Sequence, residues 1–457
     1  MRVPRRSTGA EQPVVVMKVR NGTGAKGLHR SALSKGQPKL GGIFVNKAKP
    51  FEISRYDVLE AYKRVKANKG AAGIDNKSIA EFEQDWKNNL YKLWNRMSSG
   101  SYFPSPVRRV EIPKEDGQTR PLGIPTVSDR IAQTVVKCIL EPQLEKLFHP
   151  DSYGYRPGKS ALQAVGKARE RCWEYDWVVD LDIKGFFNNI DHGLLMKAVR
   201  MHTDCKWVIL YIERWLKVPE QLEDGTLTAR VKGVPQGGVI SPLLANLFLH
   251  YAFDFWMQKN YPSIPFERYA DDGICHCRSE KQAHMLMEAI EQRFGQCGLE
   301  LHPTKTKIVY CKDDNRKGNY SDLKFDFLGF TFRPRQSKNR HGEYFINFSP
   351  AISNKAAKRI RQTIRGWKLH LRSDKSLEDL ARILNPIIRG WINYYGSYYK
   401  SALYSVMWHL DKILARWAQR KFKRLKRRPK RARSWVSEVR RREPRKFVHW
   451  QFLQSAA

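Results

Sequence analysis

Two adjacent aspartates, Asp271 and Asp272, lie in the stretch RYADDGIC, which otherwise has the composition of a buried hairpin. Short apolar runs stand on either side of the pair, and Gly273 is a typical turn residue. A solvated turn is one explanation, because Asp-Gly is a common turn dipeptide. The other explanation is functional: neighbouring carboxylates repel each other, and a bound cation would remove the repulsion.

A second group of carboxylates lies upstream, in WVVDLDIKGFFNNIDH. A strand over residues 178–183 places Asp180 and Asp182 on one face, because side chains alternate along a strand. Asp191 precedes a helical segment, and we expect it to be an N-cap and not a catalyst. If the end of this strand meets the hairpin in one sheet, three carboxylates converge. Such a cluster requires divalent cations, and two Mg²⁺ ions about 3.5–4 Å apart form the clamp used for in-line phosphoryl displacement.

A glycine-containing loop separates the two aspartate-bearing segments. It is Pro235-Gln236-Gly237-Gly238 in KGVPQGGVISPLLANLF, and its glycines permit close backbone approach to a ligand. Because the loop stands between the two carboxylate groups, we expect it to contact the phosphate or base of a substrate.

The elements that must position these residues follow from periodicity. Strands and helices alternate from residue 107 to 270, which indicates an α/β or α+β body. A helical pattern precedes this body, with Ser54 as its expected N-cap and a second helix ending near Met97. After residue 350 the pattern is helical only, with helices expected at 356–371, 376–395 and 402–425.

The charge balance indicates a polyanionic partner. The chain of 457 residues carries 83 Lys and Arg against 45 Asp and Glu, a net charge of +38. A membrane is disfavoured, because the most apolar run, Ile240–Trp256, is interrupted by Pro, Asn, His and Asp and is expected to be a buried helix. Nucleic acid is therefore the expected partner.

The helical C-terminal part interleaves basic residues with Trp and Tyr. This mixture favours nucleic-acid binding over an ordinary bundle with solvated charges. Residues 420–446 are mostly Lys and Arg, and we expect them to be disordered until they meet phosphate. The aromatic residues concerned are Trp391, Tyr394, Tyr395, Tyr398 and Tyr399.

The seven cysteines include no Cys-x-x-Cys pair, which disfavours a zinc ribbon and a disulfide framework. In Cys275-His276-Cys277, strand alternation would point the thiols away from the imidazole, so we do not expect a metal there. Reduced thiols are typical of an intracellular protein.

Seven sequence motifs resemble those of the reverse transcriptases encoded by group II introns, also called intron maturases, and they occur in the same order along the chain as in that family. A further run, LNPIIRGWINYYG, resembles the maturase domain that serves as the polymerase thumb, and the resemblance covers residues 50–425. The motifs are EIPKEDGQTRPLGIPTVSDRIAQ, DSYGYRPGKSALQAV, DLDIKGFFNNIDH, GVPQGGVISPLLANLFL, RYADDG, GLELHPTKTKIV and FDFLGFTF.

The resemblance implies an α+β right-hand polymerase with fingers, a palm that contains an antiparallel sheet, and an α-helical thumb. We expect a flexible basic arm at 1–50, an N-terminal extension with the fingers at 51–170, the palm at 171–335, the thumb and maturase domain at 350–425, and a basic tail at 426–457.

The resemblance also implies the catalytic residues. The family's metal-binding aspartates match Asp182, Asp271 and Asp272, and the main-chain carbonyl of Ile183 would be a further metal ligand. Asp180 matches no catalytic position of the family pattern, although it shares a strand face with Asp182.

Several residues match positions that contact the incoming nucleotide, the primer or RNA. Phe187 matches the bulky residue that excludes a ribose 2′-hydroxyl, whereas Phe186 is expected in the core. The other nucleotide-binding candidates are Lys114, Arg120, Gln236 and Lys305. The expected primer grip is Phe327, Leu328, Gly329 and Phe330, and the expected RNA-binding thumb residues are Arg365, Lys368 and Arg389.

The function implied is RNA-directed DNA polymerisation with two Mg²⁺ ions, together with binding of the intron RNA to promote splicing and retrohoming. The partners would be group II intron RNA, an RNA template with a DNA primer, dNTPs and target DNA, and no membrane. The expected location is the bacterial cytoplasm at the nucleoid, with an organelle less favoured. No Cys-rich or His-Asn-His endonuclease motif follows residue 425, so the resemblance is to the endonuclease-lacking type.

Two alternatives stay open. One is a group II-like reverse transcriptase recruited to host DNA repair or phage defence, which the motifs do not separate from an intron enzyme. The other is an RNA-binding maturase that acts only in splicing; such proteins can lose catalytic carboxylates, whereas Asp182, Asp271 and Asp272 are all present here.

Overall fold

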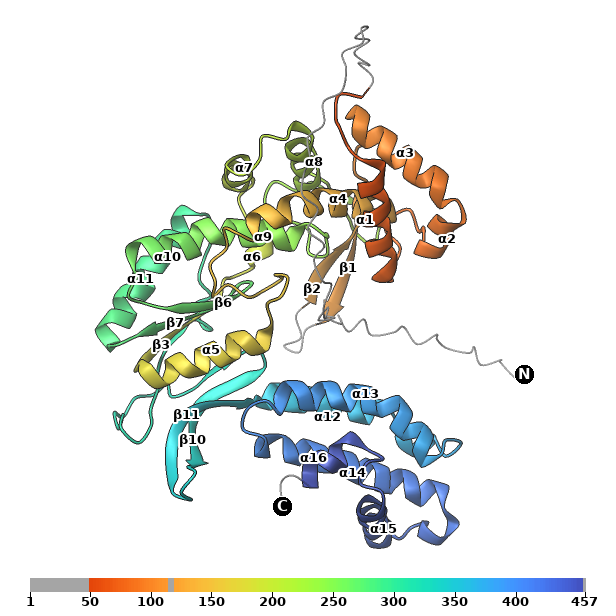
Figure 1. Ribbon diagram of the computed structural model, residues 1–457, viewed down its shortest axis with the longest axis vertical. Coiled ribbons are helices and arrows are strands. Elements are labelled where there is room, and N and C mark those ends of the chain that lie inside the picture. Colours follow the sequence, from red (N-terminus) through yellow and green to blue (C-terminus); the bar gives the residue numbers. More distant parts are fainter. Residues whose placement is uncertain (1–48, 114–118, 455–457) are drawn as a thin grey trace, which may run out of the picture. The chain divides into compact units, whose positions relative to one another are not determined.

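The computed structural model describes residues 49–113 and 119–454 (Figure 1). The chain divides into two units after Asn46, and the described residues all belong to the second unit. The expected basic arm, apart from Lys49 and Pro50, and the candidate residue Lys114 therefore lie outside the described residues.

The fingers region combines a helical layer with a small sheet. Helix α1 (Arg55–Ala67) begins at the expected cap, because the Ser54 hydroxyl accepts a hydrogen bond from the Tyr56 amide. Its buried face packs against α4 (Val127–Leu144). The sheet has the strand order β2-β1-β4-β5. The remaining elements here are α2 (Ile79–Gln84), α3 (Trp86–Ser99), β1 (Val107–Pro113), β2 (Thr119–Ile124), β4 (Glu220–Gln221) and β5 (Leu227–Thr228).

The palm is formed around an antiparallel sheet with the strand order β6-β7-β3-β8. Strand β3 (Trp177–Leu181) is the interior strand that carries the upstream aspartates. It pairs with β7 (Asp272–Cys277) on one side and with β8 (Lys307–Tyr310) on the other. Strand β6 (Phe266–Tyr269) completes the hairpin with β7, and this is the hairpin that the sequence predicts.

Helices cover both faces of the palm sheet, as the alternation along β3 requires. Val178 packs in a cluster with residues of α5 (Ala161–Glu174), whereas Val179 lies in the main core with residues of α11 (Glu280–Gln296). Figure 1 shows these two helices beside the sheet. The other palm helices are α6 (Phe186–Asn189), α7 (His192–Arg200), α8 (Lys206–Leu216), α9 (Ser241–Leu249), η1 (His250–Asp254) and α10 (Phe255–Asn260).

The apolar run at 240–256 is helical and mostly buried, as expected, but it contains one turn of π-helix, η1, between α9 and α10. No helix in the described part of the chain has the length and apolarity that crossing a bilayer requires.

A three-stranded antiparallel sheet leads from the palm to the C-terminal helices. Its order is β11-β10-β9, with β9 (Phe325–Phe327), β10 (Phe330–Lys338) and β11 (Tyr344–Ile352). Phe325, Phe332 and Phe348 form its buried face, which packs with α5. This small sheet therefore connects the palm core to the thumb.

The thumb is helical, as expected, but α12 and α14 end earlier than the periodicity suggests, whereas α13 ends at Tyr395 as expected. Helix α12 begins at the Ser353 cap and ends at Gly366, where the chain turns through Lys368 with φ +47°. The thumb elements are α12 (Asn354–Gly366), η2 (Leu369–Leu371), α13 (Leu377–Tyr395), α14 (Ser401–Lys421), η3 (Lys423–Leu425), α15 (Pro429–Arg442) and α16 (Val448–Gln454).

The expectation that residues 420–446 are disordered is wrong, because they include the end of α14, η3 and α15, and α16 follows them. Helices α15 and α16 bury Val436, Val439 and Trp450 in the same core as α12–α14. The Asp411 carboxylate on α14 accepts hydrogen bonds from Arg440, His449 and the Trp450 indole, at 3.0, 2.9 and 2.8 Å. This basic segment folds because the apolar residues spaced through it are buried in the thumb core, and a count of charges alone does not take them into account.

Candidate active site

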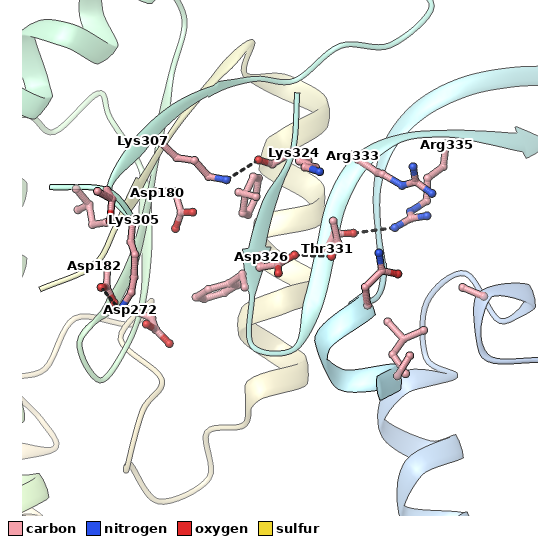
Figure 2. A pocket seen from close by; sticks show the side chains of 18 of the residues that line it. Asp180, Asp182, Asp272, Lys305, Lys307, Lys324, Asp326, Thr331, Arg333 and Arg335 are labelled. Atoms are coloured by element: carbon pink, nitrogen blue, oxygen red, sulfur yellow. Dashed lines mark hydrogen bonds and ion pairs between the residues drawn. The ribbon is translucent and has the colours of Figure 1, made fainter. Parts of the chain in front are cut away.

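The sheet register brings the end of β3 next to the catalytic turn. Leu181 pairs with Gly273, so Asp182, one residue further along β3, lies beside Asp272, one residue before Gly273. Both side chains line one cleft, which has a volume of about 650 Å³. Figure 2 shows the carboxylates of Asp182 and Asp272 close together at one end of this cleft.

The three carboxylates interact electrostatically. Burial, together with the negative charges of Asp271 and Asp182, raises the pKa of Asp272 to about 7. Burial and the charge of Asp182 also raise the pKa of Asp271. Asp272 nevertheless reaches solvent through the cleft. The site therefore concentrates negative charge where protein atoms limit its hydration.

The donor set suits Mg²⁺, which prefers oxygen ligands. The Lys305 ammonium already lies 3.2 Å from an Asp182 oxygen, so a positive charge is accommodated at this point. Within the described residues, no three or more His, Cys, Asp or Glu side chains are grouped so as to hold a metal ion by themselves.

The backbone at Ile183 fits a ligand role for its carbonyl. Ile183 forms an isolated bridge with Leu301, and the bridge hydrogen bonds run from the Lys184 amide to Glu300 and from the His302 amide to Asp182. These two hydrogen bonds use neither the amide nor the carbonyl of Ile183. The Ile183 side chain itself is buried in the main core.

Asp180 lines the same cleft, as its position on the strand face predicts, but it lies beside Lys307 (Figure 2). Burial raises the pKa of Asp180 to about 8, and the Lys307 charge partly opposes this effect. The family pattern assigns Asp180 no catalytic role, and the structure gives it the Lys307 side chain as a neighbour.

Phe187 and Gln236 lie close to one another in space. Phe187 is half-buried on α6 and meets the Tyr155 ring edge-on at 6.5 Å, whereas Phe186 is buried in the core, as expected. The Phe187 carbonyl accepts a hydrogen bond from the Val234 amide at 2.7 Å, and Gln236 donates to Asn188 at 3.2 Å. The glycine loop is thereby held against the α6 segment.

Gly237 permits a close approach between its own backbone and another part of the protein backbone, at Gly123. Gly237 has φ +114°, and a Cβ there would meet the Gly123 carbonyl oxygen at 2.5 Å. The Gly123 amide also donates to the Gln236 carbonyl at 2.6 Å. In this structure the loop therefore joins the palm to β2 of the fingers, whereas the sequence suggested a substrate contact.

Arg120 and Tyr155 also face the carboxylates. Arg120 is exposed on β2, and its positive charge lowers the pKa values of Asp271 and Asp272, although burial outweighs this effect. The pKa of Tyr155 is raised by burial and by the Asp271 charge. A Tyr near this site was not among the sequence-based candidates.

The expected primer grip is the tight turn between β9 and β10. Leu328 and Gly329 have φ +51° and +80°, the left-handed pair that suits a two-residue hairpin. Phe327 and Phe330 are buried beneath this turn. The Tyr394 hydroxyl donates to the Leu328 carbonyl at 2.8 Å, so the thumb holds the turn in place.

The thumb aromatics that the sequence analysis grouped with the basic residues pack largely within the protein. Tyr394, Tyr395 and Tyr398 surround Phe330, with ring centroids 5.2–5.7 Å away. Trp391 stacks on Trp367 at 5.5 Å. Their role in this structure is to join the thumb to the β9–β10 turn and α12 to α13.

Apart from Lys305, the basic residues that line the cleft were not among the sequence-based candidates. Arg333 and Arg335 alternate along β10 after the primer-grip turn, and this period of two is the signal that could have identified them. Burial lowers the pKa of Arg335 to about 10, with a further contribution from the Arg333 charge. The expected residues Arg365, Lys368 and Arg389 are exposed but do not line this cleft. The basic lining consists of Lys305, Lys307, Lys324, Arg333, Arg335 and Arg361.

Comparison with known proteins agrees with this site. Residues 112–332 match the family model described as reverse transcriptase (RNA-dependent DNA polymerase), and residues 357–435 match the maturase-specific domain of group II introns. The second match extends beyond residue 425 into α15, in agreement with the folded tail.

The curated relatives include proteins named for group II introns. Protein YkfC of Escherichia coli is 32% identical over 329 residues, which cover 62% of this chain and 81% of YkfC. The group II intron-encoded protein LtrA of Lactococcus lactis is 36% identical over 260 residues, which cover 56% of this chain but only 41% of LtrA. Among solved structures, an apo telomerase of Candida tropicalis truncated from its C-terminal domain aligns with a TM-score of 0.39 and 13% identity, covering 50% of this chain and 53% of that one.

The reverse transcriptase match spans the carboxylate cleft, and the maturase match spans the helices that pack against the primer-grip turn. The chain therefore belongs to the family of group II intron-encoded reverse transcriptases and maturases, with the fingers, palm and thumb of a right-hand polymerase.

Proposed function

We propose that Asp182, Asp271 and Asp272 catalyse addition of dNTPs to a DNA primer on an RNA template. The observation that carries this proposal is the sheet register, which brings Asp182 beside Asp272, the neighbour of Asp271, at one end of a cleft whose lining also includes six Lys and Arg side chains. A nucleic-acid backbone in the basic part of the cleft would place a primer end at the acidic part.

Asp182, Asp271, Asp272 and the Ile183 carbonyl would hold two Mg²⁺ ions. When bound, such ions activate a hydroxyl nucleophile and neutralise charge on a transferred phosphoryl group. Lys305 is exposed and pairs with Asp182, so it can exchange this contact for the phosphates of an incoming nucleotide. Arg120 and Lys114, from the fingers, would contact the same triphosphate, and its ribose would meet Phe187 and Gln236.

The maturase domain supports a second role. We propose that the protein binds its group II intron RNA through the thumb, with Arg365, Lys368 and Arg389 among the phosphate contacts, and that this binding promotes splicing and retrohoming into target DNA. The three thumb residues are exposed on the basic helical surface. Because target DNA would be a substrate, we propose that the protein works at the nucleoid of a bacterial cell.

The test is primer extension on an RNA template with the full chain and its Asp182→Asn and Asp271→Asn variants. Both variants should lose on the order of 10³-fold in rate, because several kcal/mol of transition-state stabilisation disappears with a metal ligand. Asp191→Asn is the matched control: Asp191 caps α7 by accepting from the Leu194 amide, and Asn caps equally well.

Splicing of a candidate intron RNA, assayed with the same variants, separates the alternatives. Retained splicing with lost extension supports two roles in one chain. A wild-type protein that splices but does not extend a primer would be a splicing-only maturase. Extension without any effect on splicing would favour a host function in repair or defence.

A further inference from the structure

A buried guanidinium lies behind the catalytic turn. The Arg268 side chain is 2% exposed, lies in the strand that precedes Asp271, and does not line the cleft. It forms a two-pronged ion pair with Asp254, which is 0% exposed: Nε donates to Oδ1 at 2.6 Å and Nη2 to Oδ2 at 2.5 Å. Paired donors of this kind fix the orientation of both partners.

The remaining hydrogen bonds of this guanidinium reach the turn itself. Nη1 of Arg268 donates to the Ala270 carbonyl at 2.8 Å and to the Asn246 side-chain oxygen at 3.1 Å. Ala270 directly precedes Asp271 and has φ +58°, in the left-handed region that costs energy for a residue with a Cβ. The guanidinium thus holds the carbonyl of a strained residue beside the catalytic pair.

The same network also fixes a second loop of the site. The Asn246 amide donates to the Gly154 carbonyl at 2.7 Å. A Cβ on Gly154 would meet the Ala270 amide nitrogen at 2.2 Å, so the two backbones are in direct contact there. Gly154 immediately precedes Tyr155, the residue that faces Phe187 and the carboxylates.

The π-helical turn explains how Asp254 comes to lie there. Asp254 is the last residue of η1, and the extra residue in a π turn changes which side chains of the helix face the sheet. Such turns occur frequently at functional sites. A well-packed apolar pair of similar volume could often replace a buried ion pair without loss of stability, so stability alone does not account for this one.

We infer that Arg268 is a positioning residue, held by Asp254 and Asn246, that fixes the left-handed Ala270 backbone and so aims Asp271 and Asp272. The inference rests on the proposed function, because it concerns the geometry of the same carboxylates. It adds residues that touch neither substrate nor metal.

The experiment compares Arg268→Lys with the wild type in single-turnover primer extension at saturating dNTP. A Lys ammonium cannot satisfy both Asp254 oxygens and also reach Ala270 and Asn246. We expect the rate to fall by about 10- to 100-fold, as for other residues that orient metal ligands from behind. The affinity for primer-template should change by less than about twofold, since phosphate contacts dominate it.

A second readout does not depend on activity. Mn²⁺ binding to the enzyme–primer–template complex, followed by electron paramagnetic resonance without nucleotide, should weaken by about 10-fold or more in Arg268→Lys. The matched control is Arg316→Lys. Arg316 is also largely buried and donates to the Asp313 carboxylate and to the carbonyls of Tyr175 and Cys172, but it contacts no part of the catalytic turn. Its rate and Mn²⁺ affinity should stay within about twofold of wild type.

Two milder changes keep the test informative if Arg268→Lys does not fold. Asn246→Ala leaves the ion pair with Asp254 intact and should still slow extension by about 10-fold. Ala270→Gly accepts φ +58° without strain, so the decrease in rate caused by Asn246→Ala should be smaller in the Ala270→Gly background.

The inference is overturned if the Arg268 and Asn246 variants extend primers and bind Mn²⁺ like Arg316→Lys. The inference is also overturned if Asn246→Ala slows extension by the same factor in the wild type and in the Ala270→Gly background, because Asn246 would then not act through Ala270. A failure of the proposed function has a different result: the wild-type chain itself would not extend a primer.

Discussion

Removal of one charge from the active site should make the metal-free protein more stable while it abolishes DNA synthesis. The change is Asp272→Asn. The pKa of Asp272 is raised from 3.8 to about 7, chiefly by burial and then by the charges of Asp271 and Asp182. The ionised carboxylate is therefore disfavoured in the folded state, and Asn resembles the protonated form that folding favours.

The size of the effect follows from the same pKa. A change from 3.8 to about 7 corresponds to at most about 4 kcal/mol, at roughly 1.4 kcal/mol per pKa unit. Because Asp272 reaches solvent through the cleft, screening reduces this, and we expect about 1–2 kcal/mol. A gain of this size raises Tm by roughly 2–8 °C for a domain of the palm's size.

The same pKa values determine whether stability rises or falls with pH. The folded-state pKa lies above the unfolded one, so the folded protein binds more protons between pH 3.8 and about 7, and stability falls as the pH rises through this window. The advantage of Asp272→Asn should therefore grow from about pH 4 to pH 7 and stay constant above. Saturating Mg²⁺ should reduce the advantage at pH 8, because the wild type gains from binding the ion.

The assay is thermal unfolding with a chelator at pH 5.5 and pH 8, and again with Mg²⁺. Asp191→Asn is the control, because its carboxylate is an exposed helix cap outside the cleft. The reasoning is refuted if Asp272→Asn lowers Tm at pH 8. It is also refuted if the gain is the same at both pH values, since the cost of ionising Asp272 in the folded protein would then not be its cause.

Three further predictions concern the cleft and the thumb. Phe187→Ala should raise the incorporation of rNTP relative to dNTP, measured in single turnovers, because the ring no longer fills the space beside the ribose; an unchanged ratio would place the steric gate elsewhere. The double variant with Arg333→Gln and Arg335→Gln should weaken primer-template binding. It should also reduce the slope of log affinity against log salt by about 0.7–0.9 for each phosphate that is no longer neutralised. A slope like that of wild type would mean that the cleft does not bind the duplex. Trp450→Ala should cost about 3–5 kcal/mol because Trp450 is 1% exposed in the thumb core, and an unfolding midpoint equal to that of wild type would show that the tail does not stabilise the thumb.

The sequence predicted best what depends on local order, such as the hairpin that carries Asp271 and Asp272. That Asp182 lies beside Asp272 depended on the condition that the hairpin joins the same sheet, and the pairing of Leu181 with Gly273 meets this condition. The antiparallel palm and the helical thumb followed from the resemblance. Asp191 capped α7 as expected, since a cap depends only on its neighbours along the chain.

The predictions failed where the answer depends on distant packing. Tyr394, Tyr395 and Tyr398 were grouped with the basic residues as a sign of nucleic-acid binding, and the sequence did not predict that they surround Phe330, which is more than sixty residues away in sequence. Residues 420–446 were predicted to be disordered because of their high positive charge, whereas their few apolar side chains find partners only in the folded thumb. No local pattern shows which side of a basic helix another domain will cover.

The buried network behind the turn shows why the missing part of the site was the hardest to predict. Three carboxylates held close together push each other apart, and the turn that carries two of them contains a strained alanine. Something must oppose both effects before any metal or substrate is bound. Arg268 can do so because a cation is buried there and fully paired, and the pairing needs Asp254 and Asn246, which a π turn and an apolar helix bring from elsewhere in the chain. The carboxylates can be recognised in the sequence by residue type and spacing. The residues that position them cannot, because neither their type nor their spacing marks them as part of a catalytic site.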